Sequence, residues 1–102
     1  MFLYNTTFGI DVSIEEQFIA WLRSEFIPTS TCDGEYFDNP ELFYVNAQQE
    51  QGIKSIALHL RAPNEEAINR WYEDHGSRLF NTIMQRWNGR AVFFSTTLEL
   101  LK

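Results

Sequence analysis

The sequence predicts a single α+β domain of 102 residues with the element order β-α-β-β-α-β. Two observations support this prediction. Apolar and polar residues alternate with a period of two near both ends of the chain and around residues 55–60, which is typical of strands. Between these stretches, two longer segments repeat apolar residues at the helical period and begin at residues that cap helices. A chain of this length is ordinarily one domain, so residues 1–102 are expected to fold together.

The N-terminal part of the chain is predicted to form one strand and one helix. Over residues 2–10 an apolar set, Phe2, Tyr4, Phe8 and Ile10, alternates with Asn5, Thr7 and Gly9. Ser13 and Glu16 have the spacing of a capping box, which predicts a helix that starts at this point. The helix is expected to end near Phe26 or Ile27, because the residue before Pro28 avoids helical backbone angles.

The middle of the chain is predicted to hold a loop and two strands. Residues 29–40 are polar and end in an Asn-Pro turn signal at 39–40, so a loop is expected there. A second strand is predicted over residues 42–48, followed by a Gln-Gly turn at 51–52. The third strand is defined by alternating apolar residues, which are Ile56, Leu58 and Leu60.

A second helix and a last strand complete the chain. Asn64 is a good N-cap, and the acidic residues at 65 and 66 favour the positive end of the helix dipole. The apolar stripe of this helix is Ile68, Trp71, Tyr72, Leu79, Ile83 and Trp87. A Gly-Ser pair at 76–77 is expected to kink or break the helix, and an Asn-Gly pair at 88–89 to end it. In the last strand, residues 90–100, one alternating set is Val92, Phe94 and Leu98, and the other is Phe93, Ser95 and Thr97.

This element order is that of the ferredoxin-like fold, in which one antiparallel sheet carries two helices on one face. The other face is expected to be uncovered, and its predicted residues are Leu3, Asn5, Thr7, Ser55, Ala57, His59, Phe93, Ser95 and Thr97. The set lacks the Lys, Glu and Asp that a solvated sheet face normally carries. Two copies are therefore expected to pack these faces together as a homodimer, a dimeric α+β barrel whose lumen is lined by hydroxyls and amides. A monomer with a shallow, wet groove is the alternative.

Composition and charge narrow the class of partner and the cell compartment. The formal net charge is −6 and no stripe of Lys or Arg occurs, so nucleic acid is not expected as a partner. No apolar run approaches the roughly 20 residues that cross a membrane. The first residues lack the basic segment of a signal peptide, which predicts a cytoplasmic protein. Cys32 is the only cysteine, and the acidic residues at 33 and 35 favour a free, unreactive thiol.

Four segments of the sequence are similar to a known family. They are Tyr4-Asn5-Thr6-Thr7-Phe8, Trp21-Leu22 leading to Ile27-Pro28, Gly76-Ser77-Arg78-Leu79, and Val92-Phe93-Phe94-Ser95-Thr96-Thr97-Leu98-Glu99. The chain resembles, over nearly its whole length, an uncharacterised bacterial family known as domain of unknown function 4286. The resemblance implies a ferredoxin-like fold of the dimeric α+β barrel type. It implies no activity.

Two histidines are the candidate catalytic residues. His59, expected on the uncovered sheet face, is either a general base or a hydrogen-bonding filler between two sheets, and no carboxylate on the central strands is placed to orient it. His75 lies between Trp71 and Leu79 on the apolar stripe. It is either a proton shuttle or axial ligand, or a residue that satisfies a backbone carbonyl where the helix is interrupted. The predicted ligand-binding residues are Asn5, Thr7, His59, Trp71, Ser95 and Thr97.

Neither a metal site nor a cofactor is predicted. The chain has only two histidines and one distant cysteine, which does not suit structural zinc. Glu73, Asp74 and His75 are consecutive on a helix, where successive side chains fan out by about 100° and cannot converge on one ion.

Two functions remain open from the sequence. The first is a homodimeric binding or structural protein with a sheet-lined cavity at the dimer. The alternative is a small dimeric α+β barrel enzyme of monooxygenase or haem-degrading type, for which Asn5, Trp71 and His75 offer a partial likeness. In haem-degrading relatives of that fold the histidine lies about three turns after the tryptophan, whereas here it lies one turn away. This spacing favours the binding protein.

Overall fold

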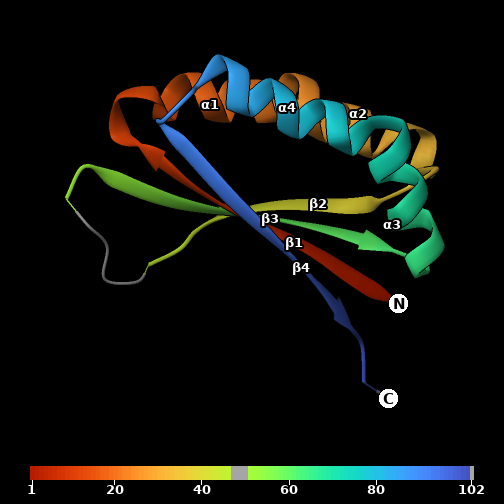
Figure 1. Ribbon diagram of the computed structural model, residues 1–102. Coiled ribbons are helices and arrows are strands. Elements are labelled where there is room, and N and C mark those ends of the chain that lie inside the picture. The colour runs from red at the N-terminus through yellow and green to blue at the C-terminus, as the bar shows by residue number, and fades with distance from the viewer. Residues whose placement is uncertain (47–50, 102) are drawn as a thin grey trace.

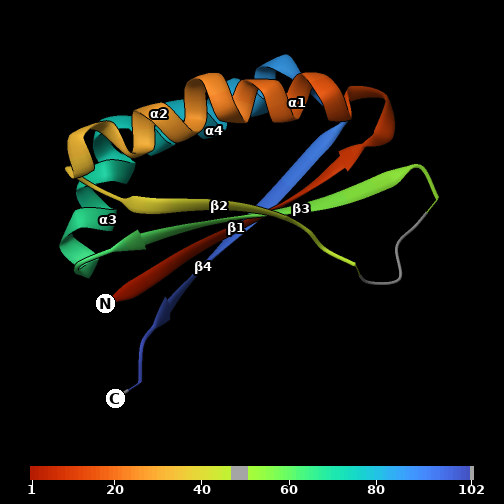
Figure 2. The same cartoon turned by 180° about the vertical axis from the view of Figure 1, so that it is seen from behind.

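One antiparallel sheet with helices on a single face makes up the fold. The computed structural model describes residues 1–46 and 51–101. The strand order is β2-β3-β1-β4, and the helices lie together above one face (Figure 1). The strands are β1 (Phe2–Asp11), β2 (Asp38–Tyr44), β3 (Ile53–Ala62) and β4 (Ala91–Glu99). Seen from behind, the opposite face carries no helix of the described residues (Figure 2). The predicted ferredoxin-like α+β fold is confirmed.

Each of the two helical segments contains a π-helical turn. The α-helices are α1 (Glu15–Trp21), α2 (Ile27–Ser30), α3 (Glu65–Trp71) and α4 (Ser77–Arg86). Residues 22–26 join α1 to α2, and residues 72–76 join α3 to α4, both with π-helical hydrogen bonding. Within the described part of the chain, no helix is long and apolar enough to cross a bilayer.

The prediction that the first helix ends before Pro28 is wrong, since the helix runs on to Ser30. In a regular α-helix a proline ring collides with the carbonyl four residues earlier. The π-helical turn widens the backbone just before Pro28, where the Ile27 amide donates to the Leu22 carbonyl five residues back. This wider turn accommodates the proline at the second position of α2.

Gly76 does not break the second helix, so of the two predicted outcomes, a kink or a break, the break is wrong. Its backbone is helical, with φ of −60°, and the π-helical turn continues directly into α4. A Cβ at this position would lie 2.6 Å from the Trp71 ring. The glycine therefore serves the close approach of the helix backbone to a buried indole.

The helix starts and the turns follow the sequence with one exception. Asp11, not Ser13, caps the first helical segment, because its carboxylate accepts a 2.8 Å hydrogen bond from the Ser13 amide. Asn64 caps α3 as predicted, and its side-chain oxygen accepts the amide of residue 67 at 2.8 Å. The predicted turns at Gly52 and Gly89 are confirmed, with φ of 86° and 77°, which glycine adopts without strain.

The second strand begins earlier than predicted. Residues 29–40 were expected to be loop, but α2 extends to Ser30 and β2 starts at Asp38. Asn39, with φ of 50°, and Pro40 form a bulge in the strand, where the pairing with β3 shifts register. A proline and a bulge are tolerated because β2 is an edge strand. The predicted end of this strand, at residue 48, lies outside the described residues.

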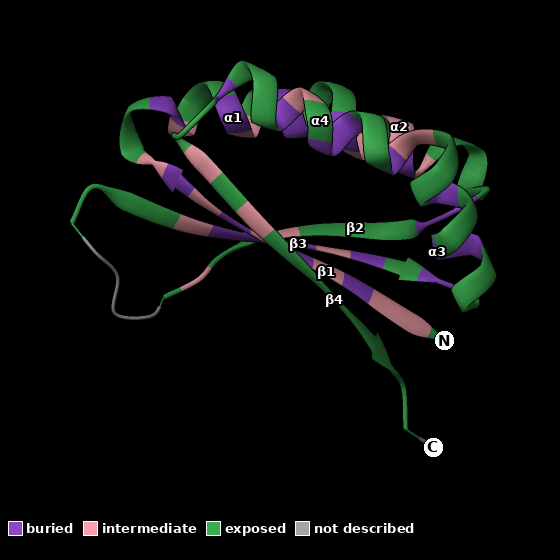
Figure 3. Cartoon of the chain, in the orientation of Figure 1, coloured by how far each residue is buried: buried purple, intermediate pink, exposed green. Residues whose placement is uncertain are grey.

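The core between sheet and helices is largely aromatic. Trp71 is fully buried at its centre, with ring centroids 5.1–6.1 Å from those of Tyr4, Phe26, Phe37 and Phe80. Figure 3 shows buried residues along the helices and along β1 and β3, whereas β2 and β4 carry none. All members of the predicted stripe on the second helix are buried except Tyr72, which is 47% exposed.

Candidate functional site

The open face of the sheet, turned away from the helices, is the candidate site. Strand pairing sets its residues in rows that run across the sheet. One row, here called the polar row, consists of Glu41, His59, Asn5 and Thr96. The next, here called the aromatic row, consists of Phe43, Ala57, Thr7 and Phe94. Beyond the aromatic row, Ser55, Gly9 and Val92 form a third row.

The predicted facing of β4 is wrong. Phe93, Ser95 and Thr97 were expected on the open face, but they pair with Phe8, Thr6 and Tyr4, whose side chains point toward the helices. The packing of Phe93 decides the matter, since its ring stacks on the Phe80 ring with centroids 4.7 Å apart. The open face consequently receives the other set of the strand, which is Val92, Phe94, Thr96 and Leu98.

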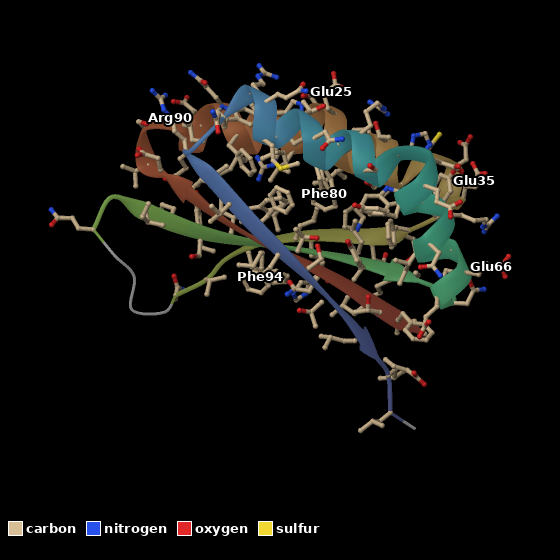
Figure 4. The ribbon with its side chains drawn as sticks, in the orientation of Figure 1. Glu25, Glu35, Glu66, Phe80, Arg90 and Phe94 are labelled. Atoms are coloured by element: carbon tan, nitrogen blue, oxygen red, sulfur yellow. The ribbon has the colours of Figure 1, made fainter. Side chains whose placement is uncertain are left out.

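This reversal makes the edge of the open face strongly apolar. Val92 is 69% exposed, Phe94 62% and Leu98 49%. Figure 4 shows Phe94 projecting from the sheet on the side opposite Phe80, which lies between the sheet and the helices. Phe43 is 44% exposed on the other edge strand. Its ring centroid lies 4.9 Å from that of His59. The rings of Phe94 and Phe43, one at each edge of the face, are here called the aromatic rims.

The polar row contains a carboxylate that sequence reasoning missed. Glu41 is directly opposite His59 across the β2–β3 ladder. The Asn39-Pro40 pair predicts a turn, so the predicted strand starts at residue 42 and excludes Glu41, whereas the structure places the pair in a bulge within the strand. An Asn-Pro signal followed by alternation could have indicated an edge-strand bulge.

Asn5, in the centre of the polar row, has an unsatisfied acceptor. Its Nδ2 atom is 3.4 Å from Thr7 Oγ1, whereas its Oδ1 atom is buried and accepts no hydrogen bond from the described residues. A buried acceptor without a donor costs about 1–3 kcal/mol. The residue is therefore prepared to accept a hydrogen bond from a group that the single chain does not supply.

The centre of the open face has short side chains. Thr7 and Ala57 lie between the aromatic rims, and Ser55 and Gly9 follow in the next row. Val92 leans over Gly9, since its Cγ2 atom would be 3.3 Å from a Cβ built there. Across the aromatic row the face is thus high at its two edges and low in the middle.

Shallow grooves border the sheet in the described part of the chain, and two of them touch the predicted residues or the open face. An apolar groove of about 480 Å³ extends the open face at the chain termini, and its lining residues include Met1, Leu3, Arg61, Leu98 and Leu101. The other groove, of about 420 Å³, lies on the helix side between β4 and α3, where Thr97 lines it with Tyr4, Tyr72 and Glu73. Near it, Ser95 Oγ is 2.9 Å from Thr6 Oγ1, and burial raises the pKa of Tyr4.

The predicted ligand-binding residues do not form one site. Asn5, Thr7 and His59 share the open face, whereas Ser95 and Thr97 lie on the helix side. Trp71 is inaccessible in the core, where its Nε1 donates to Ser30 Oγ at 3.0 Å. Binding by these residues stays a prediction, but only the open-face three can contact one small molecule.

His75 is separated from Asn5 by the sheet. Its Nδ1 atom is buried and has no hydrogen-bond partner among the described residues. The Tyr36 ring meets its imidazole edge-on with centroids 5.4 Å apart, and the Tyr36 hydroxyl donates to Asp74 at 2.7 Å. That bond raises the pKa of Tyr36 to about 12. Asn5 and His75 lie on opposite sides of the sheet with Trp71 sealed in the core, so the three residues of the haem-type likeness do not converge.

The described residues contain no group of three His, Cys, Asp or Glu side chains that could hold a metal ion. Cys32 is exposed, with its Sγ atom 4.0 Å from the Asp33 carboxylate.

Comparison with known proteins identifies the family. The family model described as domain of unknown function (DUF4286) matches residues 1–101. The chain belongs to this family. No curated protein matched the sequence.

Solved structures share the fold of this DUF4286 chain at low sequence identity. HapK from Hahella chejuensis is 14% identical with a TM-score of 0.68, and the match covers 99% of this chain and 93% of HapK. A dimeric ferredoxin-like protein from an uncultured marine organism is 14% identical with a TM-score of 0.67, covering 99% and 95%. A proposed antibiotic biosynthesis monooxygenase from Bacillus cereus is 15% identical with a TM-score of 0.55, also covering 99% and 95%.

Proposed function

We propose that the protein is a homodimeric binding protein, in which two copies pack their open sheet faces together and enclose a cavity for a small molecule. The observation that carries this proposal is the exposure of Val92, Phe94 and Leu98 on one edge strand of the uncovered sheet face and of Phe43 on the other edge strand. Large apolar side chains that gather on one uncovered face are typical of an interaction surface.

The area of the face bears on whether two copies can pack there. Four strands about 4.8 Å apart, each contributing about seven residues, give a face of about 19 Å by 23 Å. This flat area of about 440 Å² is roughly half of the 800 Å² per partner of a standard interface, and the side chains that project from the face add to the contact area. The similar fold of the marine protein described as dimeric adds support.

The relief of the face provides the cavity. When two such faces meet, the aromatic rims contact first and keep the sheets apart, whereas Thr7, Ala57 and Ser55 are too short to close the centre. The aromatic rims then wall an enclosed space into which the His59 imidazole and a few hydroxyl groups project, which is the usual character of a small-molecule site.

Sedimentation velocity of the wild type and two charge variants tests the dimer. Phe94→Glu places a carboxylate in the proposed interface, and it is expected to weaken dimerisation by about a hundredfold or more because a buried charge is left unpaired. Tyr72→Glu is the matched control, since Tyr72 is a similarly exposed aromatic residue on the helix side. A wild-type monomer at micromolar concentration, or equal dissociation constants for both variants, would rule out the proposed interface.

A second candidate function is a small dimeric enzyme of the monooxygenase type. The observation that favours it is Glu41 opposite His59, because a histidine general base needs a group that orients its ring. The fold similarity to the Bacillus cereus protein points the same way. The haem-degrading version is not carried forward, because Asn5 and His75 lie on opposite sides of the sheet.

Oxygen consumption with 1,4-naphthohydroquinone as reductant tests this candidate. Catalysis at the open face predicts loss of turnover in His59→Ala and reduced turnover in Glu41→Gln. His75→Ala is the control, because it removes the other histidine without touching the open face. If the wild type consumes oxygen no faster than the protein-free solution, the enzyme hypothesis is wrong and the binding-protein hypothesis remains.

A further inference from the structure

We propose that the two copies are related by a twofold axis that runs parallel to the strands, between β1 and β3, so that β2 of each copy faces β4 of the other. This inference rests on the homodimer proposed above and adds the relative placement of its two sheets. In this arrangement each copy also supplies a hydrogen-bond donor to a buried polar atom of the other copy.

The rows of the open face dictate which residues meet. An axis parallel to the strands keeps each row opposite itself and exchanges the two edges of the sheet. In the aromatic row, Phe43 then faces the partner's Phe94, and in the polar row, His59 faces the partner's Asn5. Facing sheets pack about 10 Å apart, a distance that an asparagine and a histidine reaching toward each other can span.

This arrangement satisfies the polar row. An imidazole N–H of His59 can donate to the buried Oδ1 atom of the partner's Asn5, which accepts nothing within one chain. Glu41 faces the partner's Thr96, whose hydroxyl can donate to the carboxylate. Complementary groups at a shared interface fix its register because each mismatch leaves a desolvated polar atom.

A twofold axis perpendicular to the strands gives a worse interface. It reverses the order of the rows in the partner. Glu41 then faces either the partner's Glu41 or an apolar side chain such as the partner's Phe43. The first choice opposes two carboxylates, and the second buries one against an aromatic ring. Asn5 Oδ1 would also face groups other than an imidazole donor.

The same arrangement places the cavity and indicates what it holds. Thr7 and Ser55 of both copies surround the axis, with the aromatic rims on either side and the paired His59 and Asn5 residues at one end. The space is about two strands wide, roughly 10 Å, and is bounded above and below by sheets. It suits a flat, mainly apolar molecule of one or two fused rings that carries one hydrogen-bonding group.

Charge exchange between the edge strands tests the register. Phe43→Lys and Phe94→Glu lie on opposite edges of one sheet, with two strands between them, so they cannot pair within a chain. In the proposed dimer the double variant F43K/F94E forms two Lys–Glu contacts between copies. The matched control F43K/F94K forms none, and circular dichroism of every variant shows that it is folded.

Sedimentation equilibrium is expected to show weakened dimers for both single variants. The F43K/F94E protein should then dimerise at least tenfold more tightly than F43K/F94K. A dimeric wild type without this difference would overturn the register and leave the dimer standing. A monomeric wild type would overturn both.

Ligand class is tested with 2-naphthol as the probe, by its fluorescence on titration with protein. Wild-type dimer is expected to bind it, and Ser55→Leu is expected to remain dimeric but to lose binding because leucine fills the cavity. Ser24→Leu, an exposed substitution on the helix side, should bind like the wild type. No binding by the wild type would overturn the ligand class, and binding retained by Ser55→Leu would overturn its location.

Discussion

Replacing Gly76 by alanine should destabilise the protein, although alanine is the better helix former. Gly76 has helical backbone angles, so by propensity alone the change would stabilise the fold by about 1 kcal/mol. The added methyl group would, however, lie 2.6, 2.8 and 2.9 Å from three atoms of the Trp71 ring. Real Cβ atoms do not approach a neighbour so closely, so either the helix or the indole must move.

The indole has little freedom to move. Trp71 is fully buried, four aromatic rings lie within 6.1 Å of its centroid, and its Nε1 donates to Ser30 Oγ at 3.0 Å. Overpacking a well-filled core costs about 1–3 kcal/mol, and this rigid contact belongs in the upper part of that range. After the gain in propensity, we expect a net loss of about 1–2 kcal/mol, with a fall in melting temperature of about 4–8 °C for each kcal/mol.

Thermal and urea unfolding of Gly76→Ala, beside the control Asn81→Ala, measure this effect. Asn81 is exposed on α4, so alanine there shows the propensity gain without the clash. Trp71→Phe removes part of the obstructing ring, so the double variant should be more stable than the two single losses predict by addition. A Gly76→Ala protein as stable as the wild type would refute the reasoning.

Three further changes have expected outcomes. Ser30→Ala leaves the buried Trp71 N–H without its acceptor and should cost about 1–3 kcal/mol in urea unfolding, and an unchanged midpoint would show that the bond contributes nothing. Asn64→Ala removes the cap of α3 and should cost about 1 kcal/mol, whereas Asn64→Gly should lose only a few tenths. The hydrogen bond to Asp74 raises the pKa of Tyr36 to about 12 from the value of 10.0 that an unperturbed tyrosine has. The folded protein holds this proton more tightly, so its contribution to stability is complete below pH 10 and is lost as the pH rises toward 12. Tyr36→Phe should reduce that fall in unfolding free energy between pH 10 and 12, and an identical pH profile would count against the bond.

The element order and the core could be predicted because they depend on local patterns. Period-two alternation located β1 and β3, and the cap at Asn64 located α3. These signals are strong where one face of an element is apolar and the other is polar. The same condition explains why the prediction failed in β4.

Residues 92–94 of β4 are all apolar, so alternation alone cannot tell which set faces the core. The stacking of Phe93 on Phe80, which is distant in the sequence, determines which side chains of β4 point toward the helices. Because the predicted facing of β4 is reversed, the predicted site on the open face includes Ser95 and Thr97 and omits Phe94. A tertiary contact therefore determined which residues form the candidate surface.

Backbone irregularities account for the remaining differences. A π-helical turn carries the first helix past Pro28, and a bulge keeps Pro40 within β2 and places Glu41 opposite His59. Both arrangements depend on the surrounding structure. The widened π-helical turn accommodates Pro28, and the position of β2 at the edge of the sheet tolerates Pro40. Proline rules applied to isolated segments cannot foresee them.

Hydroxyl-radical footprinting of Phe94, read by mass spectrometry over a dilution series, tests most directly whether a second copy covers the open face. Oxidation of Phe94 should be slow at high protein concentration and should accelerate as dilution separates the copies, while Tyr72 on the helix side reacts at one constant rate. A Phe94 side chain that is oxidised equally fast at every concentration would contradict the account.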